Sequence, residues 1–377
     1  MPDRSHHNEE MNRMKQHAFS QRGFTLIELL VALAVGGMVM AMTAQMFKSN
    51  MTASSLLNQV QNMEINARVA TDFIGRDLRA AGMGLNGAGT ESLASRPMYL
   101  WDNNLAGTAD GTSYADIKTQ LTARPGTDII EVFYSYLQEP IKLPVGGGPQ
   151  PKFSTASAQT HVPQSALTGF PGYDGANASV FEGYSVMIYD CSSSNPDPLN
   201  RRCTEVITNA QNTGTNVNLV RNNGVSVDSA NRPHSCASLA PATEVCLTIG
   251  EDVYYYVYDD PNDPDNPKLA RQRLGGARET IANFVEDFQV EVCVDNNAGV
   301  ANKRCESAEW TGSPAPNESS IRMAKINLMV RTKDLDPRKA LEAPPTLDNS
   351  TIAELAGTDK YRRRVMSRTI RLRNMGN

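Results

Sequence analysis

The chain has 377 residues, a formal net charge of −5 and a mean hydropathy of −0.40. This length allows one large domain or two small ones, and the slightly acidic balance gives no reason to expect nucleic acid or an anionic membrane surface as a bulk partner. The negative hydropathy indicates a largely water-soluble protein, so any membrane-spanning part has to be local.

One stretch near the N-terminus is apolar enough to cross a membrane. It runs from Phe24 to Phe47, and these 24 residues would form a helix about 36 Å long, enough for a hydrocarbon core of about 30 Å. Glu28 makes membrane insertion of this stretch less favourable, because a carboxylate at mid-membrane disfavours insertion by about 2.5–3.5 kcal/mol. An acid in such a segment indicates a functional role, and a tolerated carboxylate at headgroup level is the alternative.

The residues around Glu28 form a recognisable motif. The run Arg22-Gly23-Phe24-Thr25-Leu26-Ile27-Glu28 resembles the prepilin peptidase site of type IV pilins and type II secretion pseudopilins. The resemblance implies cleavage after Gly23 and N-methylation of the new N-terminal residue, Phe24. It also implies that Glu28, then the fifth residue, meets the N-terminal amine of a neighbouring subunit. This agrees with the general need of a buried charge for a partner.

A secretory signal peptide is the alternative interpretation of the same stretch. Ala32-Leu33-Ala34 has the small-x-small form of a cleavage site, but it lies too early in the apolar run, and cutting there would leave a hydrophobic stump. Residues 1–23 carry four basic and three acidic side chains. The positive-inside rule therefore favours a cytoplasmic N-terminus, with the body facing the periplasm of a two-membrane bacterium.

The helix is expected to continue beyond the membrane, because no proline occurs between Pro2 and Pro97. Small or apolar residues recur at intervals of mostly three and four, which predicts an amphipathic stripe. The stripe consists of Val60, Met63, Ala67, Ala70, Ile74, Leu78 and Ala81. Gly82 and Gly84 then supply a C-terminal stop. We predict one helix from about Phe24 to Ala81.

Two segments in the second half of the predicted helix make the family resemblance more specific. They are Asn62-Met63-Glu64-Ile65-Asn66-Ala67-Arg68 and Asp72-Phe73-Ile74-Gly75-Arg76-Asp77-Leu78-Arg79-Ala80-Ala81-Gly82. Both are similar to PilW-type minor pilins and less closely to the J-type pseudopilin of type II secretion. The strand-like runs beyond Asp128 follow the PilW pattern in order and spacing, whereas residues 140–180 and 195–245 show no resemblance.

Beyond Gly82, segments rich in Gly, Ser, Asn and Pro alternate with short β-branched or aromatic runs, each of which predicts a strand. The runs are 128–137, 182–190, 253–258, 284–294, 321–331 and 365–373. Residues 140–178 are expected to form a long loop, and 209–244 are polar and weakly patterned. Clustered strands after a helix favour an α+β fold, with the long helix packed on an antiparallel sheet.

The sequence thus predicts three parts. Residues 1–23 are a cleaved cytoplasmic leader, 24–82 a long helix that is transmembrane at 24–47, and 83–377 a β-rich periplasmic or extracellular domain.

All six cysteines lie in the part expected beyond the membrane, and an even number there favours disulfides. Sequential pairing would close three short loops, and it is one of fifteen possible connectivities. The expected pairs are Cys191 with Cys203, Cys236 with Cys246, and Cys293 with Cys305. A zinc site is not expected, because close C-x-x-C pairs are absent.

No catalytic, metal or cofactor site is predicted. His161 and His234 lie in loop-like sequence, and nothing resembles a nucleophile with a positioned base. The acidic run 259–267 has a proline where a calcium loop needs an oxygen ligand, so it predicts a surface turn. The arginine-rich run 361–373 predicts a solvated terminal strand in preference to a DNA-binding segment.

The resemblance implies a minor pilin that takes part in pilus assembly and is not an enzyme. Its expected partners are other minor and major pilins, prepilin peptidase, the inner-membrane assembly platform and, before assembly, inner-membrane lipid; nucleic acid is not expected. The expected location is the inner membrane, with a single pass, and then the pilus at the cell surface. Two alternatives stay open: a J-type secretion pseudopilin, and a tip adhesin or DNA-uptake subunit that uses 140–180 or 195–245.

Overall fold

The structure is a computed structural model, and it describes residues 24–84, 98–102, 108–109, 112–146, 150–154, 157–192, 202–222, 236–239, 242–294, 305, 310–311, 321–347, 352, 355 and 357–372. The predicted leader, Gly23 included, lies outside the described residues. The chain divides into two compact units, 1–58 and 59–377, and each is described by itself.

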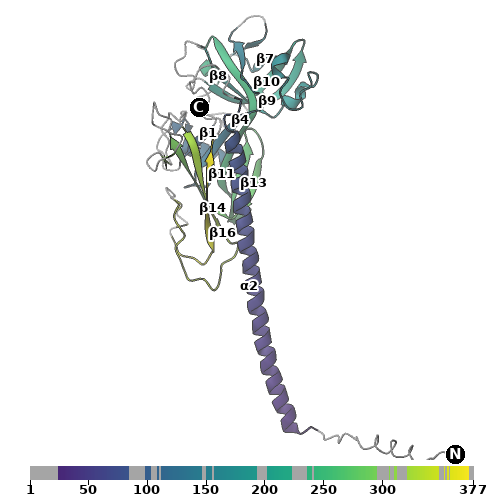
Figure 1. Cartoon of the computed structure of the whole chain (residues 1–377), viewed down its shortest axis with the longest axis vertical. Helices are drawn as coiled ribbons and strands as arrows, with labels where there is room; N and C mark the ends of the chain where they lie inside the picture. Colours follow the sequence, from purple (N-terminus) through teal and green to yellow (C-terminus); the bar gives the residue numbers. More distant parts are fainter. Residues whose placement is uncertain are drawn as a thin grey trace, which may run out of the picture. The chain divides into compact units, whose positions relative to one another are not determined.

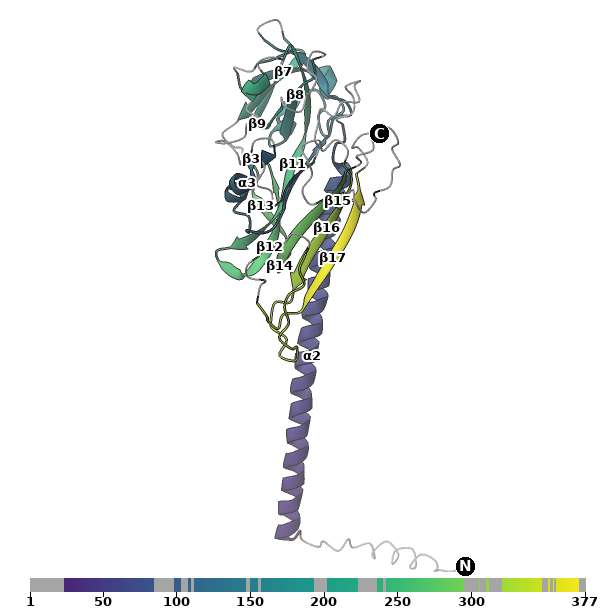
Figure 2. The same ribbon diagram turned by 90° about the vertical axis from the view of Figure 1, so that its left-hand side faces the viewer.

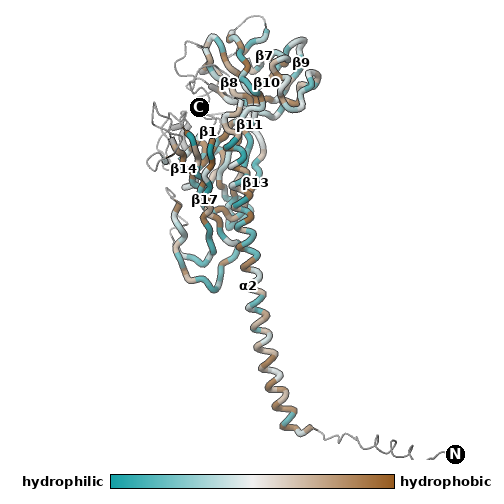
Figure 3. Tube along the Cα trace, in the orientation of Figure 1, coloured by the Kyte–Doolittle hydropathy of each residue, from teal (hydrophilic) through white to brown (hydrophobic). Residues whose placement is uncertain are grey.

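A single helix, α2, runs from Leu26 to Ala80, which confirms the predicted long helix (Figure 1). Every side chain from Phe24 to Met51 is exposed. The helix is long and apolar enough in this part to cross a membrane, and Figure 3 shows the hydrophobic residues that gather there. An apolar surface of this kind is stable in lipid or against other helices, and not in water.

The helix ends where glycine is required, as predicted. Gly82 adopts a left-handed φ of 74°, and its N–H donates to the Phe133 carbonyl at 3.1 Å. At Gly84, which has the same φ, a Cβ atom would lie 1.9 Å from the Leu137 carbonyl oxygen. These glycines turn the chain away from the helix and against the sheet.

The second unit contains an 11-stranded sheet whose ladders are antiparallel (Figures 1 and 2). Its strands are β1 (Met98–Trp101), β4 (Ile129–Ser135), β5 (Ile141–Pro144), β6 (Lys152–Phe153), β7 (Gln159–Pro163), β8 (Ser185–Asp190), β9 (Arg202–Thr213), β10 (Asn216–Asn222), β11 (Glu244–Asp260), β12 (Asp263–Arg273) and β13 (Arg278–Asn283). The main order is β1-β4-β11-β8-β9-β10-β7-β6; β12 and β5 also pair with β11, and β13 pairs with β12.

A four-stranded antiparallel sheet completes the core, in the order β15-β14-β16-β17. Its strands are β14 (Val285–Val294), β15 (Trp310–Thr311), β16 (Ile321–Arg331) and β17 (Arg363–Arg371). The remaining elements are β2 (Thr108–Ala109), β3 (Thr112–Ser113), α3 (Tyr114–Leu121) and the 3-10 turns η1 (Gln164–Leu167), η2 (Ala178–Phe181) and η5 (Cys236–Leu239).

The two sheets share one apolar core with the second half of α2. The helix contributes Met63, Ala67, Ala70, Ile74 and Leu78, all buried, and these pack with side chains from β4, β11, β14, β16 and β17. Figure 2 shows β17, in yellow, beside the helix. The stripe predicted from the sequence is therefore the face that packs on the sheets.

Strand β11 connects this core to a second one. Its first residues, Glu244 to Gly250, pair with β5 and β8, and residues 250–260 pair with β4 and β12. The second core lies within residues 137–249 and includes Phe153, Phe170 and Phe181. We call residues 137–249 the insertion module.

The insertion module corrects one expectation and contains strands in a region for which the sequence predicted none. Residues 140–178 were expected to be a loop, but they contain β5, β6, β7 and η1. The weakly patterned region 209–244 contains the end of β9 and all of β10, which form a hairpin that turns at Gly214 with a φ of 65°. These strands are short or polar on their exposed faces, so their pattern is weak in the sequence. Strands β12 and β13 were also missed, although the chain does turn within the acidic run, at Pro261–Asn262.

The structure pairs all six cysteines, but the sequential pairing is right for Cys293–Cys305 and wrong for the other four. The observed pairs are Cys191–Cys246, Cys203–Cys236 and Cys293–Cys305. The reason is strand pairing: Cys246 lies opposite Tyr189 in the β8–β11 ladder, two residues from Cys191. Cysteines 55 residues apart in the sequence thus have Cα atoms 5.6 Å apart.

Peptide mapping of the non-reduced protein is expected to find these three crosslinks, because the sheet holds each pair at bonding distance. The same digest after reduction serves as the control and should show none of them. A crosslinked peptide that joins Cys191 to Cys203 would contradict the strand pairing of β8 with β11.

Candidate functional site

The N-terminal end of α2 holds the two described residues that the motif singled out. Phe24 is 86% exposed, and Glu28 lies one helical turn away. The Thr25 N–H and hydroxyl both donate to the Glu28 carboxylate at 2.9 Å, and the Glu28 N–H donates to the Thr25 hydroxyl at 3.3 Å. This reciprocal arrangement is a capping box, which satisfies helix N–H groups that have no partner within the helix.

The capping box fixes where the acid can act. It holds the Glu28 carboxylate at the N-terminus of the helix, where the helix dipole favours a negative charge. The side chain is exposed, so the carboxylate can accept a further hydrogen bond or ion pair from outside the chain. A cationic group on another molecule is its natural partner.

A second polar site lies at the other end of the helix, where Asp77 is 2% exposed on the face that packs on the sheet. One carboxylate oxygen accepts a hydrogen bond from Arg76 Nε at 3.0 Å. The other accepts from the Tyr255 hydroxyl at 2.6 Å and from Arg271 Nε at 3.0 Å. Tyr255 belongs to β11 and Arg271 to β12, so one helical carboxylate binds two neighbouring strands.

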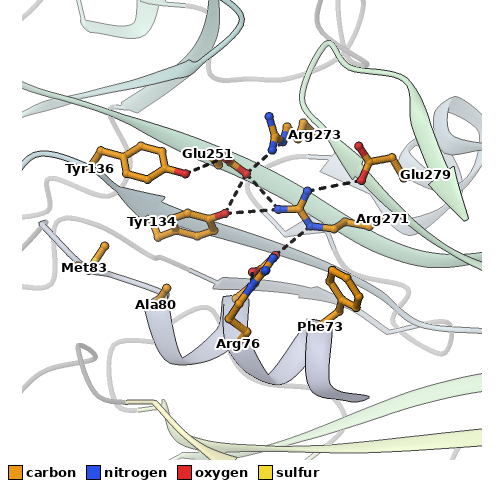
Figure 4. A pocket seen from close by; sticks show the side chains of 11 residues that line it. Phe73, Arg76, Ala80, Met83, Tyr134, Tyr136, Glu251, Arg271, Arg273 and Glu279 are labelled. Carbon is orange, nitrogen blue, oxygen red and sulfur yellow. Dashed lines mark hydrogen bonds and ion pairs between the residues drawn. The ribbon is translucent and has the colours of Figure 1, made fainter. Parts of the chain in front are cut away.

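Arg271 extends the network to a second buried acid, Glu251, at 3.0 Å (Figure 4). Glu251 also accepts hydrogen bonds from the hydroxyls of Tyr134 and Tyr136, at 2.8 and 2.9 Å, and pairs with Arg273 Nε at 3.1 Å. We call Asp77, Glu251, Arg271, Tyr134 and Tyr255 the anchor cluster. Each of its two carboxylates is paired with Arg271 and with a second arginine at the edge of the cluster, Arg76 or Arg273, and such pairing is the condition under which buried charges are tolerated.

The pKa shifts in this network agree with a fixed charge pattern. Burial alone would raise the pKa of the Glu251 carboxyl, but hydrogen bonds from the two tyrosines and Arg271 outweigh it and hold that pKa below its usual value. Burial and the hydrogen bond to Glu251 raise the pKa of Tyr136 to about 12. The acid is therefore ionised and the tyrosine protonated at neutral pH.

A pocket of about 470 Å³ opens beside the anchor cluster. Phe73, Ala80 and Met83 form its apolar wall, and Arg76, Arg273 and Glu279 form its charged rim (Figure 4). Within the part of the chain that the structure describes, no group of His, Cys, Asp or Glu is arranged to hold a metal ion. The acids of this pocket are bound by arginines and tyrosines, an arrangement that suits packing and recognition.

The arginine-rich C-terminal run forms ion pairs with α2. Arg364 pairs with Glu64 and Arg368 with Asp72, so β17 is tied to α2 by two ion pairs. Arg363 is 4% exposed and binds Glu286 on β14. The expectation of a solvated strand is wrong at Arg363, because its guanidinium group is buried between Glu286 and Asp359. Ile370 of β17 and Leu372 just after it also lie in the core.

The sequence motif found the N-terminal site and missed the anchor cluster. Asp77 follows Ile74 by three residues and therefore lies on the predicted buried face. A charged residue at such a position is a signal that a partner exists, since unpaired charges are not buried. Nothing in the sequence identifies Arg271 or Tyr255 as that partner, because they lie 194 and 178 residues away.

Two family models match the chain. One, described as Type IV Pilus-assembly protein W, matches residues 254–374, from β11 to the end of β17. The other, the prokaryotic N-terminal methylation motif, matches residues 14–44 and includes Gly23, Phe24 and Glu28. The chain is a PilW-type pilin. It functions as a minor pilin in type IV pilus assembly.

Other comparisons add little to the identification of this pilin. No curated protein matches it. Among solved structures, the type IV-like pilin TTHA1219 from Thermus thermophilus is 14% identical. The match covers 51% of this chain and 86% of that one, with a TM-score of 0.17. That score is too low to carry an argument about the fold.

Replacing Asp77 with alanine is expected to destabilise the pilin by about 3–5 kcal/mol, because it leaves Arg271 buried with one of its two acids removed. Asp72→Ala is the matched control on the same helix. Asp72 is 69% exposed, so losing its pair with Arg368 should cost less than about 1 kcal/mol. Urea unfolding of the detergent-solubilised full chain measures both, and equal losses would contradict the assigned role of Asp77.

The depressed pKa of Glu251 predicts acid sensitivity. The unfolded carboxyl binds a proton near its usual pKa of about 4.3, whereas the folded one stays ionised to lower pH. The stability from this group is thus fully present above pH 4.3 and is lost as pH falls through the folded pKa. In Glu251→Gln, the free energy of unfolding should fall less steeply between about pH 5 and 3. Identical slopes in the two proteins would contradict the shift.

Proposed function

We propose that this minor pilin is made as a membrane precursor and primes pilus assembly after processing. Residues 1–23 form a cytoplasmic leader that prepilin peptidase removes after Gly23, and Phe24 becomes the N-methylated N-terminus. Residues 24–47 hold the protein in the inner membrane, and the body of residues 83–377 lies in the periplasm until assembly. The methylation-motif match and the exposed apolar half of α2 support this order of events.

The observation that carries the proposal is the position of Glu28. The capping box with Thr25 holds its carboxylate one turn from Phe24, with its outer side exposed. We infer that this acid receives the N-terminal amine of a neighbouring subunit. Inside a filament both charges leave water, and each can be accepted there because the other balances it.

Assembly of this kind needs partners and no catalytic step. The inferred partners are other minor and major pilins, prepilin peptidase and the inner-membrane assembly platform. The buried titratable groups support a role without catalysis, because each acid of the anchor cluster is held by arginine and tyrosine. The same helix and processing site would serve a secretion pseudopilin, and the PilW match over residues 254–374 favours the pilus.

A second candidate function rests on the insertion module. Residues 137–249 lie outside both family matches, yet they form their own apolar core, and Cys203–Cys236 lies within it. Such a module could bind a surface or DNA at the pilus tip. Antibody fragments against the module, added to cells with normal pilus number, should then block adherence or DNA uptake. Unchanged adherence and uptake would remove this candidate.

Substituting Gly23 tests the main proposal. Gly23→Leu should leave the full-length protein in the membrane and absent from sheared pili, because it puts a branched side chain at the assigned cut, where the matched motif region of this chain has glycine. Gly36→Ala is the control: a Cβ atom at Gly36 meets nothing within 4 Å, so processing should be normal. Immunoblots of membranes and sheared pili measure both proteins. Normal processing of Gly23→Leu would contradict the assigned cleavage site.

A further inference from the structure

The connection between β16 and β17 begins with a segment that exposes large apolar side chains. We call this segment, residues 332–347, the strap. Beyond Met83, three large apolar side chains are exposed among the residues that the structure describes: Leu335 at 52%, Leu341 at 63% and Val365 at 37%. Two of the three lie on the strap, and the third lies near the start of β17. Exposed apolar residues that gather in one place indicate a contact surface.

The strap contains no helix or strand, yet polar bonds hold it against the segment that precedes β17. Asp336, which is 1% exposed, accepts from Arg362 Nη2 at 2.6 Å. Three residues later, the Lys339 ammonium donates to the Tyr361 carbonyl at 2.7 Å. These bonds draw polar side chains inward and fix the backbone around the two strap leucines. The leucines are therefore exposed by a bonded segment of the protein.

The strap also binds α2 at the point where the helix enters the second unit. Gln59 is the first residue of that unit. Its amide nitrogen donates to the Asp334 carboxylate at 2.8 Å, and its amide oxygen accepts from the Asp334 N–H at 3.1 Å. Only residues 48–58 separate Gln59 from Phe47, the end of the apolar stretch that is able to cross a membrane. The chain thus tethers the strap to the bilayer by a short connection, which favours contact between them.

The charges on the strap suit a phospholipid surface and do not require an anionic one. Its three cations and three acids balance; they are Lys333, Arg338 and Lys339, and Asp334, Asp336 and Glu342. Lys333 is exposed and forms no ion pair within the described part of the chain. Leu335 is two residues away. A leucine with a lysine close by fits the boundary of a bilayer, because the leucine enters the acyl region while the ammonium reaches a phosphate.

We propose that the strap contacts the phospholipid surface of the inner membrane while the pilin is anchored there. Leu335 and Leu341 enter the boundary between headgroups and acyl chains, and Lys333 binds a lipid phosphate. The contact is lost when the subunit leaves the membrane for a filament. This inference rests on the proposed function, which anchors residues 24–47 in that membrane.

The size of the surface favours lipid over a protein partner. A stable protein interface takes about 20–30 residues a side, whereas this surface offers three large apolar side chains separated by charged residues. Contact with a bilayer needs no such area, because the membrane-spanning part of the same chain already holds the two surfaces together.

Photocrosslinking in cells tests the inference with the full-length protein. Benzoylphenylalanine replaces Leu341 on the strap, and in a matched control it replaces Met83, which is 43% exposed and follows the C-terminal end of α2. Cells are labelled with radioactive phosphate, and mass spectrometry identifies the adducts from membranes and from sheared pili. We expect a phospholipid adduct at position 341 in the membrane fraction, none at position 83, and none at either position in pili.

A second substitution tests the chemistry of the contact. Leu335→Asp should lower the yield of the lipid adduct at position 341 by about tenfold. This change corresponds to about 1.4 kcal/mol, close to the smallest gain from burying one leucine side chain. Leu335→Met keeps an apolar side chain and should leave the yield unchanged. Leu335 is half exposed, so both variants should fold, and near-ultraviolet circular dichroism checks this.

The outcomes separate this inference from the proposed function. A processed protein that enters pili but gives no more lipid adduct at position 341 than at position 83 would overturn the inference and leave the function intact. Adducts only with proteins at position 341, or an unchanged yield in Leu335→Asp, would overturn it too. A protein that is absent from the membrane fraction would contradict the proposed function, and the inference with it.

Discussion

A single buried carboxylate on α2 determines how the helix meets the sheets. Asp77 lies on the packed face, where a lone charge would be strongly unfavourable, so its position requires Arg271 and Tyr255 opposite. Arg271 also pairs with Glu251. Glu251 in turn accepts hydrogen bonds from Tyr134 on β4 and from Tyr136 just after β4. Apolar packing alone would let the helix slide or rotate on the sheets, whereas this chain of directed bonds permits one register.

The two ends of α2 carry different chemistry because they meet different surroundings. At the N-terminal end the apolar side chains are exposed, and the Glu28 carboxylate is held in position by hydrogen bonds from Thr25. At the other end the acids and arginines are shared with β-strands. The proposed function requires that the helix leave lipid for a filament while the body stays folded. A helix that is apolar at one end and firmly bonded to the body at the other meets both demands.

The sequence predicted what depends on local pattern and missed what depends on distant pairing. The helix from Phe24 to Ala81, its stop at Gly82 and strand β16 follow from periodicity and glycine placement, and the structure confirms them. Cys191 and Cys246 meet because β8 and β11 pair, and Asp77 meets Arg271 because β12 lies beside β11. Such contacts follow from the register of the sheet, which no local window of the sequence contains.

The most direct test of this account is the intact mass of the protein taken from sheared pili. The account predicts a mass that lacks residues 1–23 and carries one added methyl group on Phe24. The same protein from cells without prepilin peptidase should retain its full length. An uncleaved chain in wild-type cells, or a cut near Ala34, would contradict the assignment of Gly23, Phe24 and Glu28 as the processing and assembly site.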